Sequence, residues 1–217
     1  KKALVERFVD DVTGRVAGNC QTSDGCAAFH HLLGPLEEAR LMEGLVKRIR
    51  DNGWHIDYGI LGSKYVLRML GEYGYTEVIY KMLTRKDYPG YQYWMDHGCT
   101  TLAECWNLGG SHNHYMFSDV SAVFYRYFAG IRLKEDVPAY RRFLLSPALD
   151  LEIGSLSCSV ETPHGAIQVS WEKKEDRMFF TAKIPFGTRA RLVLPSRIDE
   201  SGMELGSGEY KFCWKMN

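Results

Sequence analysis

The side chains with the clearest chemical potential lie within one short stretch, residues 98–115. It contains a carboxylate at Glu104, an indole at Trp106 and imidazoles at His112 and His114. A carboxylate that acts as an acid or base, beside aromatic faces and hydrogen-bonding groups, is what hydrolysis of a sugar acetal requires. An ordinary helix–loop–helix connection, with a solvated glutamate and histidines that cap the next helix, has the same composition and remains the alternative.

The composition excludes several other classes of protein. The chain has 217 residues, and its 27 lysines and arginines balance its 27 aspartates and glutamates. This balance gives no charge excess for nucleic acid or a membrane surface, so we expect neither partner. No run approaches the roughly 18 apolar residues of a membrane span, and Lys1-Lys2 does not open a signal peptide. The compartment is left open between cytoplasm and periplasm.

Neither a metal site nor a disulfide framework is predicted. The six cysteines form no Cys-X-X-Cys pair, and their spacing suits neither a zinc site nor a redox motif. Scattered reduced thiols are therefore expected. His112, His114 and Asp119 are near one another in sequence, but the two histidines are only two residues apart. We expect no metal there and no cofactor elsewhere.

The first part of the chain shows helical periodicity interrupted by polar, aromatic loops. Leu4, Phe8, Val12 and Val16 recur every four residues, as on one face of a helix. By this pattern and by cap and breaker residues, helices are predicted over 3–16, 22–33, 36–51, 63–73, 76–83 and 111–130, with loops over 54–62 and 84–98.

Helices joined at alternate connections by polar-aromatic loops are what an α/α toroid needs. Inner and outer helices then run antiparallel, and the site is built from loops at one end. The six predicted helices are half of a twelve-helix ring, so we predict half of an (α/α)6 toroid over residues 1–133. Half a toroid leaves a broad apolar helix face uncovered, and we expect self-association through this face.

After Ile131 the pattern changes to short β-rich runs separated by prolines. Ile167, Val169 and Trp171 alternate with polar residues, which is typical of a strand with one buried face. Similar runs cover 143–145, 156–160, 178–184 and 190–194. We predict a small antiparallel β-sandwich over residues 134–217, and hence an α+β multidomain chain.

Seven segments follow one another in a distinctive order. They are Gly18–Thr22, His55–Ser63, Gly98–Trp106, Ser111–Tyr115, Tyr125–Ile131, Arg142–Pro147, and Ser159–Gly165 leading to Val169–Glu172. In this order, with a change from helical to strand patterns between them, they resemble the bacterial α-L-rhamnosidases of glycoside hydrolase family 78. The resemblance covers nearly the whole chain. It implies the C-terminal half of an (α/α)6 barrel followed by the family's C-terminal β-sandwich.

The resemblance also implies an activity, which is inverting hydrolysis of terminal α-L-rhamnosyl residues in glycosides or polysaccharides. By the family's pattern Glu104 is the general base, His114 contacts the rhamnose, and Trp106 lies beside the base. A neutral imidazole can donate to one sugar hydroxyl and accept from another. The indole of Trp106 can offer a flat face to a sugar or can belong to the core.

A second group of candidates comes from the position of the loops. His55, Asp57 and Tyr58 lie on a predicted loop at the same end of the barrel as Glu104, so we expect them to line the site. Gln21 and the Thr100-Thr101 pair are expected to be positional groups that bond the loop backbone.

This sequence departs from the family's pattern in three places. Ala103 stands where the family usually has tryptophan, and the connection from Trp106 to Ser111 is short. The family's general acid lies in an upstream acidic loop that has no counterpart in this chain. Inversion needs two carboxyl groups roughly 6.5–9.5 Å apart. We therefore expect an incomplete catalytic unit that supplies only the base.

Two other functions remain open at this point. The chain can be a non-catalytic fragment, or a sugar-binding or assembly module. It can also derive from a different (α/α)6 glycosidase, such as a glucoamylase-like hydrolase.

Overall fold

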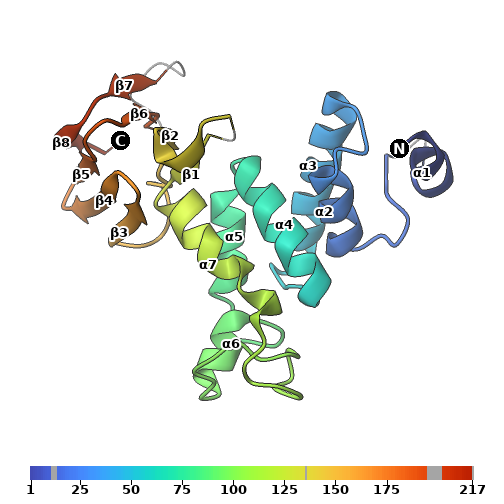
Figure 1. The fold of residues 1–217 in the computed structure, drawn as a ribbon. Coiled ribbons are helices and arrows are strands. Elements are labelled where there is room, and N and C mark those ends of the chain that lie inside the picture. Colours follow the sequence, from blue (N-terminus) through green and yellow to red (C-terminus); the bar gives the residue numbers. More distant parts are fainter. Residues whose placement is uncertain (11–13, 135, 195–201, 217) are drawn as a thin grey trace. The chain divides into compact units, whose positions relative to one another are not determined.

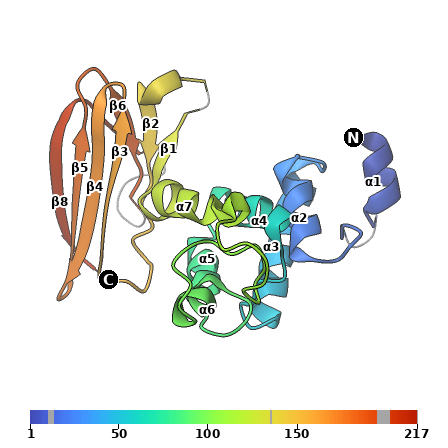
Figure 2. The same cartoon turned by 60° about the horizontal axis from the view of Figure 1, so that its bottom comes forward.

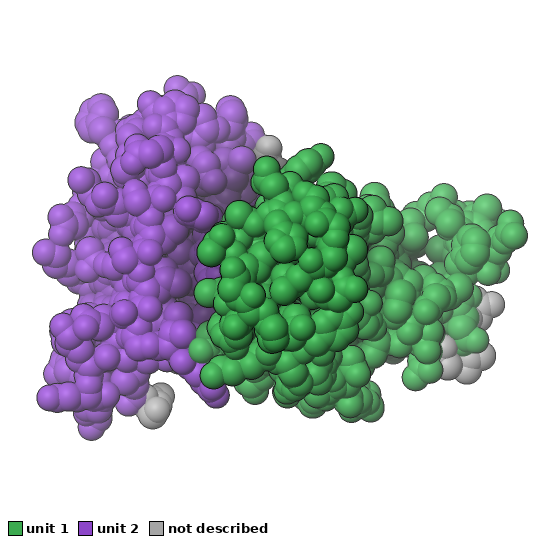
Figure 3. All heavy atoms as spheres, turned by 90° about the horizontal axis from the view of Figure 1, so that it is seen from below, with its two compact units in different colours: residues 1–123 green, residues 124–217 purple. Residues whose placement is uncertain are grey.

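The computed structural model contains two compact units, residues 1–123 and 124–217 (Figure 3). It describes residues 1–10, 14–134, 136–194 and 202–216. The helices of the first unit are α1 (Lys2–Phe8), α2 (Gln21–Phe29), α3 (Pro35–Asp51), α4 (Ile60–Glu72), α5 (Thr76–Leu83), α6 (Tyr91–Asp96) and α7 (Asp119–Val123), with a 3₁₀ turn at Tyr115–Phe117 (Figure 1). A domain boundary after residue 133 stays a prediction.

Helix α3 agrees closely with its sequence prediction. It begins at Pro35, whose missing N–H costs nothing in the first turn. Glu37 in the first turn and Arg50 in the last complement the helix dipole. Leu45 and Ile49 are fully buried on the face that packs against α2 and the rest of the unit. The amphipathic pattern therefore predicts both the helix and its buried face.

Helices α2, α4 and α7 form a row, with α4 between the other two (Figures 1 and 2). Helix α3 packs on α2, and α5 packs on α4. The contact between α2 and α4 is close because glycines lie in it. A Cβ atom at Gly25 would lie 3.1 Å from the Cα of Val66, and one at Gly62 would clash with Thr22. Neither position has room for a side chain.

The loops that precede α2, α4 and α7 meet at one end of this row. The N–H of Gln21, the first residue of α2, donates to the carboxylate of Asp57 (3.0 Å) in the loop before α4. The Nε1–H of Trp106, in the loop before α7, donates to the carbonyl of Tyr58 (2.7 Å). The three helices thus present their first turns to the same end, as the toroid prediction requires.

Three predicted helices are wrong in extent, and the one predicted over 22–33 ends at Phe29. The helix predicted over 3–16 ends at Phe8, because Val9 turns extended and pairs in antiparallel fashion with Val16. Both are β-branched residues, which favour extended backbone. Residues 11–13 of that prediction lie outside the described residues. The helix predicted over 111–130 is replaced by the 3₁₀ turn, α7 and a π-helical turn at Phe124–Phe128.

The prediction of a loop over 84–98 is also partly wrong, because this segment contains α6. Four of the six residues of α6 are aromatic or apolar: Tyr91, Tyr93, Trp94 and Met95. Their spacing does not mark one apolar face of a helix, so the sequence pattern gives no signal for this helix. Tyr91 and Trp94 are buried, so tertiary packing stabilises this short helix.

The second unit is built from two four-stranded sheets within the described residues. Its strands are β1 (Ile131–Leu133), β2 (Arg142–Leu145), β3 (Ser155–Thr162), β4 (Gly165–Lys174), β5 (Arg177–Ile184), β6 (Arg189–Leu192), β7 (Met203–Leu205) and β8 (Gly208–Lys215). The sheet orders are β1-β2-β6-β7 and β3-β4-β5-β8. All neighbours pair in antiparallel fashion except β2 and β6, which are parallel.

The core of this unit lies between the two sheets. Phe143 and Leu192 from the first sheet and Val169, Trp171 and Phe180 from the second belong to one cluster of buried side chains. The alternation predicted for β4 is confirmed, since its inward residues are at most 2% exposed. A sandwich of two sheets therefore follows the helical unit, as predicted.

Candidate active site

Residues 98–114 form a loop whose two arms are joined by backbone hydrogen bonds. The N–H of Glu104 donates to the carbonyl of Ser111 (2.8 Å), and the N–H of His114 donates to the carbonyl of Leu102 (2.8 Å). These bonds place Glu104 and His114 on facing arms of one loop. Local backbone pairing therefore brings together two residues that are ten positions apart in the sequence.

The carboxylate of Glu104 is held by the backbone of its own loop. Its Oε2 accepts a hydrogen bond from the N–H of Ser111 (3.0 Å), and the residue is half-buried. Among the described residues this is the one hydrogen bond to the carboxylate, so Oε1 is left to accept a proton from another molecule. This is the arrangement of a group that can act as a general base.

His114 carries a polar atom that is buried and unsatisfied. Its Nε2 has no hydrogen-bond partner among the described residues, while its ring lies parallel to that of Tyr115 with centroids 6.4 Å apart. A buried donor or acceptor without a partner costs about 1–3 kcal/mol. A ligand hydroxyl that bonds this nitrogen would remove that cost.

Trp106 is engaged in packing below the loop. Its ring stacks on Trp94 with centroids 4.5 Å apart and contacts Tyr91 and Phe117 edge-on or tilted. The Nε1–H of Trp94 donates to the carbonyl of Trp106 (2.9 Å). Tyr58 is buried beside Trp106, and burial, followed by the nearby Tyr91 hydroxyl, raises its pKa well above the ordinary value. Contact of Trp106 or Tyr58 with a sugar stays a prediction.

His55 lies in a separate cluster at the surface. Its Nδ1 is 2.7 Å from the carbonyl of Asn52, and its Nε2 is 2.9 Å from Oδ2 of Asp87. Hydrogen bonds from Arg85, and then from His55, hold the pKa of the exposed Asp87 well below its usual range. Within the described residues the His55 ring bonds Asn52, Asp87 and Arg85 and not Glu104, so its part in a site with Glu104 stays a prediction.

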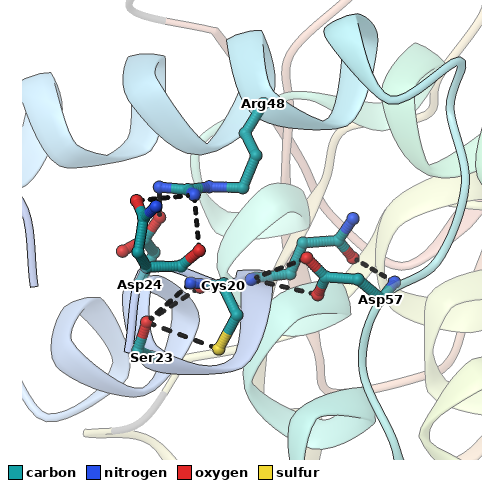
Figure 4. A network of polar contacts seen from close by, with 7 residues as sticks. Cys20, Ser23, Asp24, Arg48 and Asp57 are labelled. Atoms are coloured by element: carbon teal, nitrogen blue, oxygen red, sulfur yellow. Dashed lines mark hydrogen bonds and ion pairs between the residues drawn. The ribbon is translucent and has the colours of Figure 1, made fainter. Parts of the chain in front are cut away.

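Gln21 and Thr101 bond loop backbone, as predicted. The Gln21 amide donates to the carbonyl of His55 (2.7 Å) and accepts from the N–H of Asp57 (3.2 Å). The Thr101 hydroxyl donates to the carbonyl of His112. Asp57 in turn accepts from the first N–H of α2, and partial desolvation raises the pKa of its carboxyl (Figure 4). Asp57 thus positions a helix start rather than standing free.

An ion pair that sequence reasoning missed lies beside this contact (Figure 4). Asp24 of α2 is 1% exposed, and its Oδ2 accepts from Nη2 of Arg48 (3.0 Å) at the end of α3. Arg48 also donates to the carbonyl (2.7 Å) and side chain (2.8 Å) of Asn19. The pair joins residues 24 apart in sequence, and no local pattern indicates it.

The pKa of Asp24 gives a test of this buried pair. Desolvation raises it from 3.8 to about 6, although Arg48 opposes the shift. A raised folded-state pKa adds stability below the unfolded value, and that stability is lost as the pH rises through about 6. Over this window the loss is roughly 3 kcal/mol. We expect Asp24→Asn to gain unfolding temperature relative to the parent as the pH rises from about 4 to about 8.

The measurement is the thermal unfolding midpoint of the complete protein at several pH values. Asp51→Asn is the matched control. Asp51 lies on α3, is half-exposed and pairs with Lys47 of the same helix. Its difference from the parent should change little with pH. An Asp24→Asn difference that is equally flat would contradict the assigned cause.

A hollow of about 690 Å³ lies in the first unit beside α3, away from Glu104. Asp24, Arg40, Arg48 and Asp57 are among its lining residues, and none of them comes from residues 98–118. Three of its charged residues already have partners within the protein, since Asp24 pairs with Arg48 and Asp57 binds the start of α2. The volume of this hollow therefore does not make it the candidate active site. The chemistry of Glu104 and His114 favours the loop formed by residues 98–114.

Other classes of site find little support in the described part of the chain. No three His, Cys, Asp or Glu residues there are arranged to hold a metal ion. All six cysteines are free thiols. No helix within the described ranges has both the length and the apolar character to cross a membrane.

Family models match both units. The model for the bacterial α-L-rhamnosidase six-hairpin glycosidase domain matches residues 1–128, and the model for the bacterial α-L-rhamnosidase C-terminal domain matches residues 130–209. An α-L-rhamnosidase of Formosa agariphila is 35% identical over 149 residues, which cover 65% of this chain and 16% of that protein. One of Alteromonas sp. is 28% identical over 207 residues, covering 90% of this chain and 22% of its own length.

A solved structure agrees with the fold. The Streptomyces avermitilis α-L-rhamnosidase complexed with L-rhamnose superimposes with a TM-score of 0.89 at 25% identity, covering 99% of this chain and 23% of that one. The predicted fold class, half of an (α/α)6 toroid followed by a β-sandwich, is confirmed. The chain spans about a fifth of the length of these relatives.

Proposed function

The chain belongs to the bacterial α-L-rhamnosidase six-hairpin glycosidase family, and from this premise we propose that the protein carrying it hydrolyses terminal α-L-rhamnosyl residues with inversion. The observation that carries the proposal is the Glu104 loop. One oxygen of the Glu104 carboxylate is fixed by the N–H of Ser111, and the facing arm holds His114 with an unsatisfied Nε2. The substrate is a rhamnose-containing glycoside or polysaccharide.

In this mechanism Glu104 acts as the general base. It takes a proton from a water molecule while the water oxygen attacks the anomeric carbon, and the bond to the leaving group breaks on the opposite face. A second carboxyl group donates a proton to the departing oxygen. The resemblance to the family gives no residue of this chain for that acid, so the proposal assigns only the base side.

His114 has the role of a substrate-binding residue. Its backbone is fixed by Leu102, so the imidazole is presented from a defined position, and Nε2 can donate to or accept from a sugar hydroxyl. Trp106, Tyr58 and Asp57 support the loops through their contacts within the protein, and His55 borders the same end of the helix row. Self-association through an uncovered helix face stays a prediction.

The direct test uses the complete protein and a panel of p-nitrophenyl glycosides. We expect release of p-nitrophenol from the α-L-rhamnoside and from no α-glucoside. Proton NMR of the fresh reaction should show β-L-rhamnose first, because inversion changes the anomeric configuration. Hydrolysis of α-glucosides alone would favour the glucoamylase-like alternative. α-L-rhamnose as the first product would exclude inversion, and with it single-step attack by a water molecule that Glu104 activates.

A further inference from the structure

The connection from Trp106 to Ser111 is a short turn that folds back onto Glu104. The N–H of Leu108 donates to the carbonyl of Cys105 (3.0 Å). The carbonyl of Leu108 lies 2.8 Å from Nε2 of His112. The N–H of Gly109 donates to the Asn107 side chain (3.1 Å). The turn is therefore tied to itself at several points, and its path beside Glu104 is well defined.

Gly110 lies directly against the Glu104 carboxylate. A Cβ atom at this position would be 2.6 Å from Oε2, 3.1 Å from the carboxyl carbon and 3.3 Å from the Cβ of Glu104. Real Cβ atoms do not come within 2.6 Å of an oxygen, so a side chain at 110 must displace the carboxylate. The φ angle of +77° is a left-handed conformation that glycine adopts readily and other residues adopt at a cost.

The hydrogen bond from Ser111 to Glu104 is not needed to close the turn. The backbone pair from Glu104 N–H to the Ser111 carbonyl already closes it, with a distance of 2.8 Å. The second bond, from Ser111 N–H to Oε2, adds only a restraint on the side chain. Both features act on one oxygen of one carboxylate, since Gly110 gives it space and Ser111 gives it a donor.

We propose that Gly110 and the N–H of Ser111 are positioning groups that hold Oε2 of Glu104 so that Oε1 receives the proton of the attacking water. This inference rests on the proposed function of Glu104 as the base. In the step, the water oxygen forms a bond to the anomeric carbon while one water proton moves to Oε1. The leaving group departs with the electron pair of its bond, and Oε2 keeps its hydrogen bond from Ser111.

Gly110→Ala in the complete protein tests the proposal against Gly109→Ala as the matched control. The atoms nearest to a Cβ at Gly109 belong to the flexible Asn107 side chain, the first at 3.1 Å, so the control adds the same methyl group one residue away. Displacement of a reacting group by about 1 Å can cost up to 100-fold in rate. We expect Gly110→Ala to lower kcat by at least about tenfold, with KM within about twofold of the parent. Gly109→Ala should retain parent kcat.

Azide separates a displaced base from a distorted loop. Azide attacks the anomeric carbon without losing a proton, so the C–N bond forms and p-nitrophenolate leaves with its electron pair without help from a base. We expect azide to raise the turnover of p-nitrophenyl α-L-rhamnoside in Gly110→Ala and to yield the rhamnosyl azide. The parent and Gly109→Ala should gain nothing. A loss in Gly110→Ala that azide does not relieve would overturn the proposal.

Two further variants keep the outcomes distinct. Ser111→Pro replaces the N–H that faces Oε2 with a ring carbon and adds no Cβ at Gly110, although it also removes the hydroxyl that accepts the N–H of Asn113 (3.1 Å). It should show the same kcat loss and azide response if Gly110→Ala fails to fold. Glu104→Gln is measured in parallel. Lost turnover in Glu104→Gln with full turnover in both loop variants would overturn the positioning role alone. Full turnover in Glu104→Gln would overturn the base assignment, and the positioning role with it.

Discussion

Replacement of Glu104 by glutamine is expected to lower kcat by about two to four orders of magnitude, which is the range that general acid–base groups contribute. Glutamine has the same shape and keeps an oxygen that can accept the Ser111 N–H, so the loop should retain its path. It cannot take a proton from water. Binding should therefore persist while turnover is lost, and steady-state kinetics with p-nitrophenyl α-L-rhamnoside in the complete protein measures both.

Glu43→Gln provides the matched control for this substitution. Glu43 is exposed on α3 and distant in sequence from the loop, and its replacement by glutamine removes the same charge. It should leave kcat and KM at parent values. A Glu104→Gln protein that keeps near-parent kcat would remove Glu104 from the mechanism and leave the family membership without an assigned base.

Truncation of Trp94 to alanine is expected to reduce the free energy of opening of the α6 and loop region by about 3–5 kcal/mol. Trp94 is 2% exposed and lies among Tyr91, Trp106 and Phe117. It also donates to the carbonyl of Trp106. Alanine leaves a cavity and an unbonded carbonyl two residues after Glu104. Amide hydrogen exchange measures opening free energies segment by segment and suits this test.

Two comparisons sharpen the result for Trp94. Trp94→Phe keeps an aromatic ring but loses the donor, so its cost should be smaller, nearer the value of about 1 kcal/mol for one hydrogen bond plus some lost packing. Trp54→Ala removes a half-exposed tryptophan that contacts the cations of Arg50 and Lys81. It should leave exchange in α6 unchanged. Equal protection of α6 in Trp94→Ala and the parent would exclude the supporting role of this ring.

The parts of the fold that sequence predicts are those with strong local periodicity. The amphipathic pattern of α3 and the alternation of Ile167, Val169 and Trp171 both lead to the correct element and buried face. The failures lie where a contact that the periodic pattern does not show decides the local structure, either a nearby backbone pairing or tertiary packing. The pairing of Val9 with Val16 ends α1 early, and burial of Trp94 makes a helix in a segment rich in turn residues.

The candidate site divides in the same way. The order of motifs predicts Glu104 and His114 as site residues, and the structure places them on facing arms of one loop. The sequence does not reveal that the Ser111 N–H binds the carboxylate, because a backbone donor leaves no mark on residue type. Nor does it reveal the pairing of Asp24 with Arg48, which depends on how α2 and α3 pack.

The glycine contact between α2 and α4 bears on any effort to make this protein more heat-resistant. Exchange of helical glycine for alanine commonly stabilises by about 0.4–1 kcal/mol through the unfolded chain. That substitution is not available at Gly25 and Gly62, where an added methyl group would push α2 and α4 apart beneath the loops of the candidate site. Gly44 in α3 faces open space, with nothing within 4 Å of a Cβ, and is a site where engineering by this route is compatible with the architecture.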